Sequence, residues 1–362
     1  MTIMTDERAS ITGGVDTHRD NHVAAALDER GGQLDVRSFP TTPSGHRDLL
    51  AWLRAFGPVE RVGIEGTGTW GAGLTRHLVA EGVRVIEVDR PNRQRRRRTG
   101  KSDPIDAVAA ARATLSGEAA SLAKDRTGPV EAIRTLRVAR RSAQGARRQA
   151  MNQLHSVITT APVELREQLR DLNGRVLVDT AARLRPGLGC DPLVAAKTTL
   201  RALARRIGFL EAECAELDGL LVPLVATTAP GLVALHGVGT DTAGALLVSA
   251  GENADRLHSE AAFAHLCGVA PIEASSGQVV RRRLNRGGDR QANSALWRIV
   301  LVRMGTEERT KAYLKRRSAE GKSKRDVMRS LKRYVAREVW AELPGVVFER
   351  SRDEAGEASD EQ

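Results

Sequence analysis

The chain has 362 residues, a length that two domains usually occupy, and its 41% hydrophobic and 28% charged residues exclude a chain that is disordered throughout. The 56 Lys and Arg residues outnumber the 45 Asp and Glu residues, and the net charge of +11 favours an acidic partner, above all nucleic acid. Three scattered cysteines without a C-x-x-C pair exclude a disulfide scaffold and a cysteine zinc module. With a polar N-terminus and no apolar run that could span a membrane, a cytoplasmic protein is expected.

Residues 11–115 alternate between strand and helix patterns. Short connections predict an antiparallel meander of three strands, and a helix with Ser44 as its N-cap follows it. The predicted strands are 11–16, 22–28, 33–39, 62–65 and 83–88, and the predicted helices are 44–56, 74–80 and a third from Asp103 onward. This order is the order of the ribonuclease H fold, by fold-level analogy. An α/β N-terminal domain is therefore expected.

The middle of the chain, about 128–225, has a helical pattern. One apolar seam steps by 3 and 4 residues, which predicts a coiled-coil hairpin or a dimer contact, and an ordinary amphipathic bundle is the alternative. A partner seam has Arg140 and Arg147 in two of its slots. The first seam consists of Leu200, Leu203, Ile207, Leu210, Cys214, Leu217 and Leu221.

From Pro230 onward the pattern predicts a mostly helical domain. A two-glycine turn opens an Ala-rich helix over 235–247, and further helices are expected near 259–268 and from Arg290. The basic segment Lys311 to Arg337 is expected to form one or two helices on a nucleic acid backbone. Its aromatic residues, Tyr313, Tyr334 and Trp340, are expected to fill a small core rather than to stack on bases. The predicted domains are 8–122, 123–228, 229–345 and a disordered acidic tail over 346–362.

Four acidic residues stand at element ends in the N-terminal part. Asp16 ends the first strand, Glu65 ends the fourth, and Asp103 and Asp106 lie three residues apart on one face of a helix. The first and fourth strands of a ribonuclease H sheet are neighbours, so the four carboxylates could converge on Mg²⁺ or Mn²⁺. The structural alternatives are turn and helix-cap roles. His18 and His22 are interpreted as polar turn residues rather than metal ligands.

The loop before Asp103 is strongly basic. A run of this kind is usually a solvated segment, but here it adjoins the proposed acidic centre, where a polyanionic substrate needs charge neutralisation. The candidate nucleic-acid-binding residues of this loop are Arg93, Arg95, Arg96, Arg97, Arg98 and Lys101.

The segments VDTHRDNH, IEGTGTWG and KSDPIDA resemble the conserved blocks of the DEDD transposases of the insertion-sequence one-ten family. The resemblance implies a RuvC-like domain joined through a coiled coil to a smaller C-terminal transposase domain. It also implies a divalent metal at the four acids and a noncoding bridge RNA that selects the target and donor DNA. It covers about 11–115 and 230–305.

The C-terminal blocks LHGVGTDTAGALLVSAG and LCGVAPIEASSGQVVRRRLNRGGDRQANSALW are similar to the other part of this family. The resemblance implies that Ser276, followed by Gly277, is the nucleophile, and a shift of one residue would select Ser275 instead. The sequence departs from the family at His236, where Pro is usual, and at Gly288-Asp289, where Gly-Asn is usual and a strand contact could be altered.

Two further features of the C-terminal part suggest contact with phosphates. The segment 236–244 resembles a helix-hairpin-helix turn, in which Gly237 and Gly239 would let backbone amides approach a phosphate, and a plain helix-turn-helix contact is the alternative. A basic ribbon follows Ser276, with surface charge as its alternative reading. It consists of Arg281, Arg282, Arg283, Arg286 and Arg290.

The sequence thus predicts a DNA transposase or recombinase that acts as a homodimer or homotetramer, because the acids and the serine lie in separate domains. One rival is a junction-resolvase-like nuclease that uses the four acids and water. The other is a basic architectural protein without enzymatic activity. The absence of a G-x-x-x-x-G-K-[ST] loop agrees with strand exchange that needs no ATP.

Overall fold

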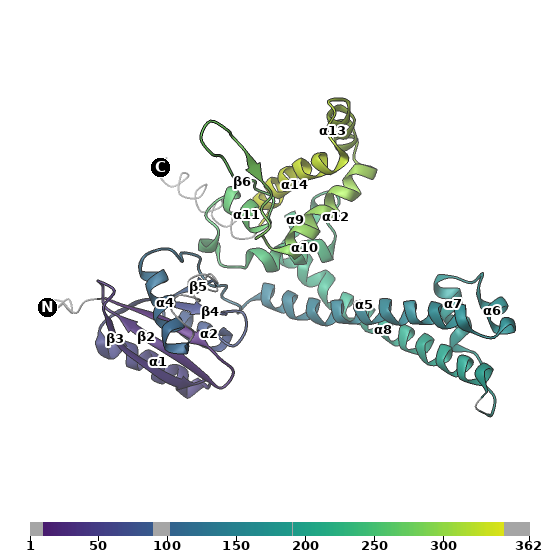
Figure 1. Ribbon diagram of the computed structural model, residues 1–362, viewed down its shortest axis with the longest axis horizontal. Helices are drawn as coiled ribbons and strands as arrows, with labels where there is room; N and C mark the ends of the chain where they lie inside the picture. The colour runs from purple at the N-terminus through teal and green to yellow at the C-terminus, as the bar shows by residue number, and fades with distance from the viewer. Residues whose placement is uncertain (1–9, 90–101, 190, 344–362) are drawn as a thin grey trace, which may run out of the picture.

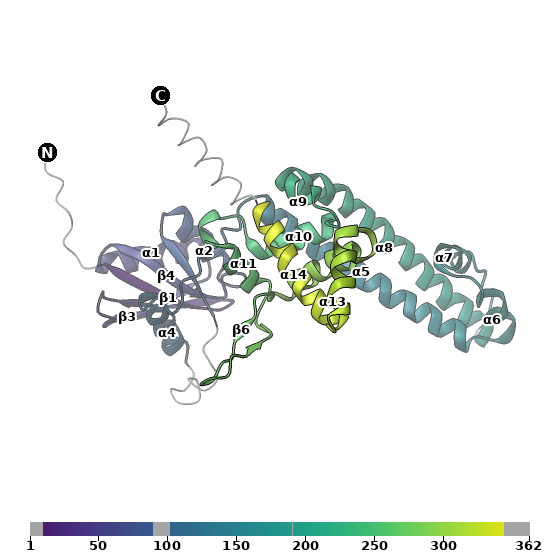
Figure 2. The same ribbon diagram turned by 90° about the horizontal axis from the view of Figure 1, so that it is seen from above.

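The computed structural model describes residues 10–89, 102–189 and 191–343, and its three parts are a sheet domain, a long helical hairpin and a helical C-terminal domain (Figures 1 and 2). The sheet has the order β3-β2-β1-β4-β5. β1 is antiparallel to β2 and parallel to β4, as a ribonuclease H-like fold requires, so the predicted α/β domain is confirmed. The strands are β1 (Ile11–Thr17), β2 (Asn21–Leu27), β3 (Gln33–Pro40), β4 (Val59–Glu65) and β5 (Arg84–Val88).

Helices cover both faces of this sheet. α1 (Pro43–Phe56) and α2 (Ala72–Ala80) bury leucines against Val15 and Ile64. α4 (Asp103–Leu115) packs its alanines against Ala25 and Leu27 on the opposite face. The predicted N-cap of α1 was wrong, because Thr42 rather than Ser44 accepts the Gly45 amide, at 3.1 Å. Pro43 has no amide proton and fits the first helical position, which moves the helix start one residue earlier.

The middle of the chain is helical, as predicted. α5 (Pro129–Thr160) and α8 (Pro192–Thr228) pack along each other, with α6 (Val163–Leu169) and α7 (Gly174–Ala182) at the far end (Figure 1). The two arginines of the seam have carboxylate partners on α8: Arg140 binds Asp218 at 2.9 Å, and Arg147 binds Glu211 at 2.6 Å. These pairs explain how charged side chains occupy apolar slots. A coiled coil in the strict sense stays a prediction.

The C-terminal domain is mostly helical, as predicted, and centres on residues such as Phe263, Leu296 and Ile299. Tyr313 and Trp340 pack against this core, but Tyr334 is 49% exposed, so the prediction that it fills the core was wrong. The elements are α9 (Pro230–Ala234), α10 (Thr240–Ala250), the 3-10 turn η1 (Ala254–Arg256), α11 (Glu260–Leu266), β6 (Ile272–Glu273), β7 (Arg282–Arg283), α12 (Arg290–Thr306), α13 (Glu308–Ala319) and α14 (Lys324–Ala341).

The sheet domain and the C-terminal domain meet at the outer edge of β5. Leu122 forms a bridge with Ile86 and extends this edge. The C-terminal domain caps the extension, because Asn253 donates to the Ala123 carbonyl at 2.9 Å and Arg256 donates to the Leu122 carbonyl at 3.1 Å. Polar backbone groups at a sheet edge need partners when they are buried, and these side chains supply them. Among the described residues, none of the helices is both long and apolar enough to cross a membrane.

Candidate active site

The positions of two paired glycines show which face of the sheet the first two acids occupy. Gly14 on β1 lies beside Gly63 on β4, and both strands continue in register towards Asp16 and Glu65. A Cβ atom at Gly14 would lie 2.2 Å from the Ala111 amide, and one at Gly63 would lie 2.0 Å from Oγ1 of Thr114, so both glycines lie directly under α4. Residues two apart on a strand share a face. Asp16 and Glu65 therefore lie on the face of the sheet that α4 covers.

The first turn of α4 brings the other two acids to the same place. His18 lies between Asp16 and Asp103, with its Nε2 atom 3.2 Å from Asp16 Oδ2 and 3.4 Å from Asp103 Oδ1. Ligand atoms of these three residues lie within 4.8 Å of one another. Asp106 is buried and acts electrostatically on Asp16. The structure thus brings Asp16, Asp103 and Asp106 together, and Glu65 ends the neighbouring strand on the same face of the sheet.

His18, interpreted from the sequence as a polar turn residue rather than a metal ligand, contacts both Asp16 and Asp103 in this group. Asp16 and His18 are two residues apart at a strand end, a spacing that places both side chains on one face. His22 lies elsewhere, fully buried, and its ring stacks on His46 at 5.6 Å between centroids.

The electrostatics of the group favour a bound cation. Burial raises the pKa of Asp16 above its ordinary value, the carboxylates of Asp106 and Asp103 raise it further, and His18 opposes the rise. A divalent ion would relieve this repulsion, and the oxygen donors suit Mg²⁺ or Mn²⁺. The donor set therefore fits a divalent metal.

The second candidate group lies on the β6–β7 hairpin, where hydrogen bonds distinguish the two adjacent serines. The Ser275 hydroxyl donates to Glu273 Oε1 at 3.0 Å and accepts from the Arg281 amide at 3.2 Å. The Ser276 hydroxyl has no hydrogen-bond partner within the described part of the chain. Ser276 opens the terminal turn, where Gly277 has a φ of +58°. Ser275 therefore links the two strands of the hairpin, while the Ser276 hydroxyl makes no such bond among the described residues.

The hairpin and the acidic residues lie in separate parts of the molecule. In Figure 1 the hairpin marked β6 projects upward from the C-terminal domain and lies well above the sheet that carries the acids.

Comparison with known proteins agrees with these two groups of residues. The model of the IS110-type DEDD family, described as a transposase, matches residues 13–161, and the model described as transposase IS116/IS110/IS902 family matches residues 231–315. The chain belongs to the IS110 family of DEDD transposases. The first match contains all four acids, and the second contains Ser276.

The chain is similar to a protein of Streptomyces coelicolor. That protein is called the insertion element IS110 uncharacterized 43.6 kDa protein and is 31% identical over 128 residues. The alignment covers 35% of this chain and 31% of the relative.

The departures from the family pattern have structural explanations. Asp289 is the N-cap of α12 and accepts from the Gln291 amide at 2.7 Å, so the expected change in a strand contact was wrong. Asp and Asn are both good N-caps, and the helix start is preserved. His236 holds the end of α12 through Thr306, at 2.8 Å.

The residues predicted to contact phosphates differ in their surroundings. Gly237 packs against Ile299 and Arg303 of α12, and Gly239 starts α10, where its amide donates to the Thr242 hydroxyl at 3.0 Å. The basic loop residues Arg93, Arg95, Arg96, Arg97, Arg98 and Lys101 lie outside the described residues. On the hairpin and the loop after it, Arg281, Arg282 and Arg283 are exposed and Arg286 is accessible at the rim of two hollows.

A further group of arginines was missed by the sequence interpretation. A hollow of about 490 Å³ between α5, α10 and α12 has Asp241 as its acidic lining residue. Asp241 pairs with Arg137 and Arg298, at 3.1 and 2.6 Å. Burial and then the neighbouring arginines lower the pKa of Arg137, while Asp241 opposes this. Three more lining arginines have no ion pair with another described residue, namely Arg141, Arg148 and Arg290.

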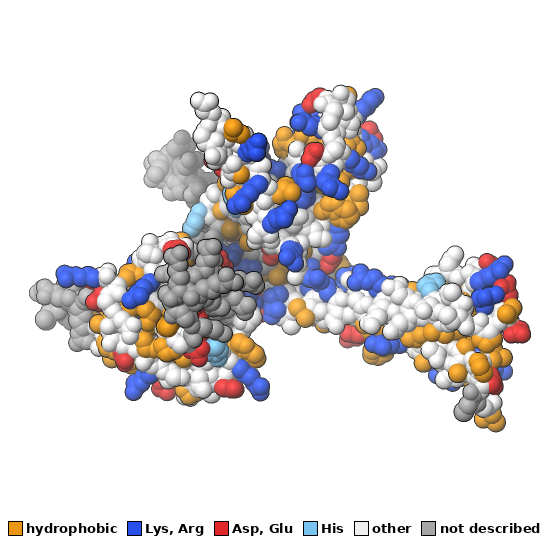
Figure 3. All heavy atoms as spheres, viewed as in Figure 1, with side chains coloured by type: hydrophobic (Ala, Val, Ile, Leu, Met, Phe, Trp, Pro, Cys, Tyr) orange, Lys and Arg blue, Asp and Glu red, His pale blue; other side chains and the backbone are white. Residues whose placement is uncertain are grey.

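This arginine hollow is suited to phosphate. Its α5 members follow one helix face, at 137, 141 and 148, and that spacing is the signal that could have found them. Figure 3 shows Lys and Arg side chains spread over the C-terminal domain and along the near part of the hairpin of α5 and α8. An anion in the hollow would relieve the repulsion between the guanidinium groups.

Proposed function

We propose that this protein is a DNA transposase that cuts and rejoins insertion-element and target DNA with a serine nucleophile. The observation that carries the proposal is the group of acids under α4, in which Asp16, Asp103 and His18 have ligand atoms within 4.8 Å of one another. Carboxylates that crowd one buried place are the usual device for holding divalent ions at a phosphodiester.

Asp16, Glu65, Asp103 and Asp106 would hold the metal, with His18 bridging two of them. A divalent ion bound there would polarise the scissile phosphate and ease the loss of the serine proton. His18 keeps the carboxylates of Asp16 and Asp103 in place by contacts of 3.2 and 3.4 Å. The arginine hollow and the Arg281–Arg283 ribbon would bind the flanking phosphates.

Ser276 would attack a DNA phosphorus atom through Oγ. A bond between Ser276 Oγ and phosphorus forms, one bond from phosphorus to a deoxyribose oxygen breaks, and the hydroxyl proton ends on the leaving oxygen by way of solvent. The phosphoserine link preserves the bond energy, so a second strand end can displace Ser276 and reseal the backbone without ATP. The free Ser276 hydroxyl and the occupied Ser275 hydroxyl support this assignment.

The site would be completed between protomers. The hairpin lies well above the sheet of its own chain in Figure 1, so Ser276 of one protomer would serve the acids of another in a homodimer or homotetramer. A noncoding bridge RNA would select the DNA, as the family resemblance implies.

The test is formation of a covalent protein–DNA adduct. Purified protein is incubated with element-end DNA, candidate bridge RNA and Mg²⁺, and adducts are separated under denaturing conditions. Wild type should form the adduct. Ser276→Ala and Glu65→Ala should lose it by roughly 1,000-fold or more. Ser275→Ala should retain it at a reduced level, because the hairpin loses two hydrogen bonds.

Each rival has its own signature in the same assay. Cleavage that persists in Ser276→Ala would indicate a nuclease that uses water. If the protein binds DNA without cleaving it, and Asp16→Ala binds equally well, an architectural protein would be indicated. An adduct that survives Ser276→Ala and disappears in Ser275→Ala would move the nucleophile by one residue. Omitting the RNA tests the guide, since joining should then fall to background.

A further inference from the structure

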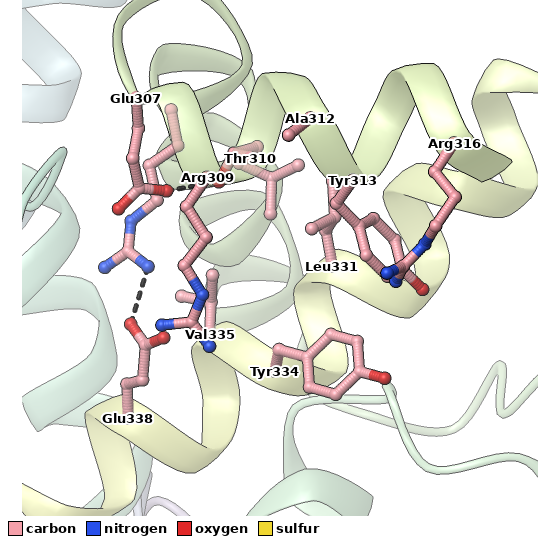
Figure 4. A pocket seen from close by; sticks show the side chains of 12 residues that line it. Glu307, Arg309, Thr310, Ala312, Tyr313, Arg316, Leu331, Tyr334, Val335 and Glu338 are labelled. Atoms are coloured by element: carbon pink, nitrogen blue, oxygen red, sulfur yellow. Dashed lines mark hydrogen bonds and ion pairs between the residues drawn. The ribbon is translucent and has the colours of Figure 1, made fainter. Parts of the chain in front are cut away.

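Tyr334 on α14 separates two hollows of the C-terminal domain. The first, here called the aromatic hollow, measures about 540 Å³ and lies between α12, α13 and α14 (Figure 4). Val300, Leu331 and Val335 provide apolar surface, and the rings of Tyr313 and Tyr334 meet edge to face with 5.8 Å between centroids. Tyr334 is half exposed. A flat aromatic ligand can therefore reach a tyrosine ring and an apolar surface at once.

Polar groups surround the aromatic hollow. The Arg316 guanidinium lies over the Tyr313 ring, 5.3 Å from its centroid. Arg309 reaches in from the opposite side in Figure 4 and has no ion pair with another described residue. Glu338 is held by Arg303 at 2.5 Å and leaves carboxylate oxygen available as an acceptor. A heterocycle with both donors and acceptors on its edge would find partners here, whereas an aliphatic ligand would leave them unused.

The second hollow, here called the basic hollow, measures about 620 Å³ and shares Tyr334 as a lining residue. No Asp or Glu is among its described lining residues. Burial and then Arg329 lower the pKa of Lys332, and burial and then Arg337 lower the pKa of Arg333. Repulsion of this kind is relieved by an anion. The cationic lining residues are Arg286, Arg329, Lys332, Arg333 and Arg337.

Three of these cations have no charged partner in the described chain. Arg329 pairs with Asp326 at 2.7 Å, and Arg333 pairs with Glu260. Arg286, Lys332 and Arg337 have no ion pair with another described residue. Lys332 donates to the neutral Asn293 side-chain oxygen at 2.9 Å. Charge complementarity therefore points to a phosphate in the basic hollow, beside the ring that borders the aromatic hollow.

We propose that Tyr334 is the centre of a site for one unpaired nucleotide, with the phosphate in the basic hollow and the base in the aromatic hollow against the tyrosine ring. The shared chemistry is that of single-stranded DNA or RNA, since every base has a flat face that can stack. The inference rests on the proposed function only in taking nucleic acid as the ligand.

Equilibrium binding tests the site without any strand joining. A labelled pentanucleotide is titrated with full-length protein in the absence of divalent metal, as DNA, as RNA and as a DNA with an abasic central position. Tyr334→Leu should weaken binding of the intact strands by roughly 5- to 100-fold, the range measured for loss of base stacking. Tyr334→Phe keeps the ring and should bind within about 2-fold of wild type.

The salt dependence of the binding affinity distinguishes the contribution of the base from that of the phosphate. The slope of log affinity against log salt should be unchanged in Tyr334→Leu and should fall by about 1 in Arg337→Gln. The abasic strand should bind wild type and Tyr334→Leu equally. The matched control is Phe209→Leu, which replaces an exposed aromatic residue on α8 and should bind like wild type. The DNA and RNA arms show which strand is preferred.

Two results would overturn the site. One is equal affinity of wild type and Tyr334→Leu for the intact strands. The other is that Tyr334→Leu changes the self-association of the protein in the absence of nucleic acid while base-dependent binding stays intact. That result would assign the aromatic hollow to a second copy of this chain. Because the assay measures binding without metal and without strand joining, failure of the serine mechanism leaves this measurement unaffected.

Discussion

Three histidine rings stack inside the sheet domain. His22 of β2 lies on His46 of α1 with 5.6 Å between centroids, and His46 lies on His77 of α2 at 6.3 Å. Both ring nitrogens of His22 are buried without a hydrogen-bond partner. Burial, and then the charges of His46 and His18, lower the pKa of His22 to about 4. A protonated ring is therefore costly in the folded state.

This stack predicts acid sensitivity of the sheet domain. The His22 pKa is 6.5 in the unfolded chain and about 4 in the folded chain. As the pH falls from 6.5 towards 4, the unfolded chain binds a proton that the folded chain excludes, so stability is lost in that window. The loss attributable to His22 should reach about 2 to 3 kcal/mol near pH 4.5.

The measurement is the free energy of unfolding in urea at pH 7 and pH 4.5. His22→Phe should reduce the difference between the two values by that amount. His155→Phe, an exposed substitution on α5, should keep the wild-type difference. An unchanged difference in His22→Phe would refute the assignment.

At the scale of elements, the position of α4 on the sheet determines whether the acids meet. α4 approaches β1 and β4 closely because Gly14 and Gly63 have no side chains between the strands and the helix backbone. The approach places the first turn of α4, with Asp103 and Asp106, beside the ends of β1 and β4. The glycines two residues before each strand acid are thus part of the site's construction.

Gly14→Ala should therefore displace α4. The added Cβ would lie 2.2 Å from the Ala111 amide, a backbone atom that cannot rotate away. We expect a loss of about 1 to 3 kcal/mol of stability, which is typical of overpacking, together with a large loss of adduct formation. Gly145→Ala on α5 meets no atom within 4 Å and should raise the unfolding free energy by about 0.5 to 1 kcal/mol. Full adduct formation in Gly14→Ala would contradict this view of the site.

At the scale of the whole molecule, Arg256 connects the sheet domain to the C-terminal domain. It donates to the Leu122 and Ala250 carbonyls at 3.1 and 3.0 Å and lies 3.5 Å from Glu87 on β5. Glu87 also accepts from Thr67, in the loop that follows Glu65. Because Arg256 is nearly buried, its bonds are poorly replaced by water.

Removing this connection should uncouple the domains. Arg256→Met keeps the side chain's length but leaves buried carbonyls and Glu87 with fewer partners, at a cost of about 2 to 4 kcal/mol. Calorimetry should show two separated thermal transitions in Arg256→Met where wild type shows closer coupling. Arg54→Met, which breaks the exposed pair with Glu81, should cost less than about 1 kcal/mol. A single unchanged transition in Arg256→Met would show that the domains are coupled elsewhere.

Much of the fold followed from local patterns along the chain. The strands at 11, 22, 33 and 62 and the helices from 103 and 290 begin within a few residues of their predicted positions, because alternation, caps and Gly turns are local signals. The predictions that were wrong also have local causes. Pro43 moved the start of α1, and the Tyr334 ring lies on the exposed side of an amphipathic helix.

The sequence by itself determined the order of elements and the family, and it singled out the four acids and Ser276 as candidates, since these depend on residue types at short spacings. Tertiary structure alone decided that His18 bridges two carboxylates, that Ser275 is bonded and Ser276 is free, and that arginines from α5 and α12 surround one hollow. Those facts depend on contacts between segments far apart in the chain. Such contacts arise from packing, which leaves no pattern in a single stretch of sequence.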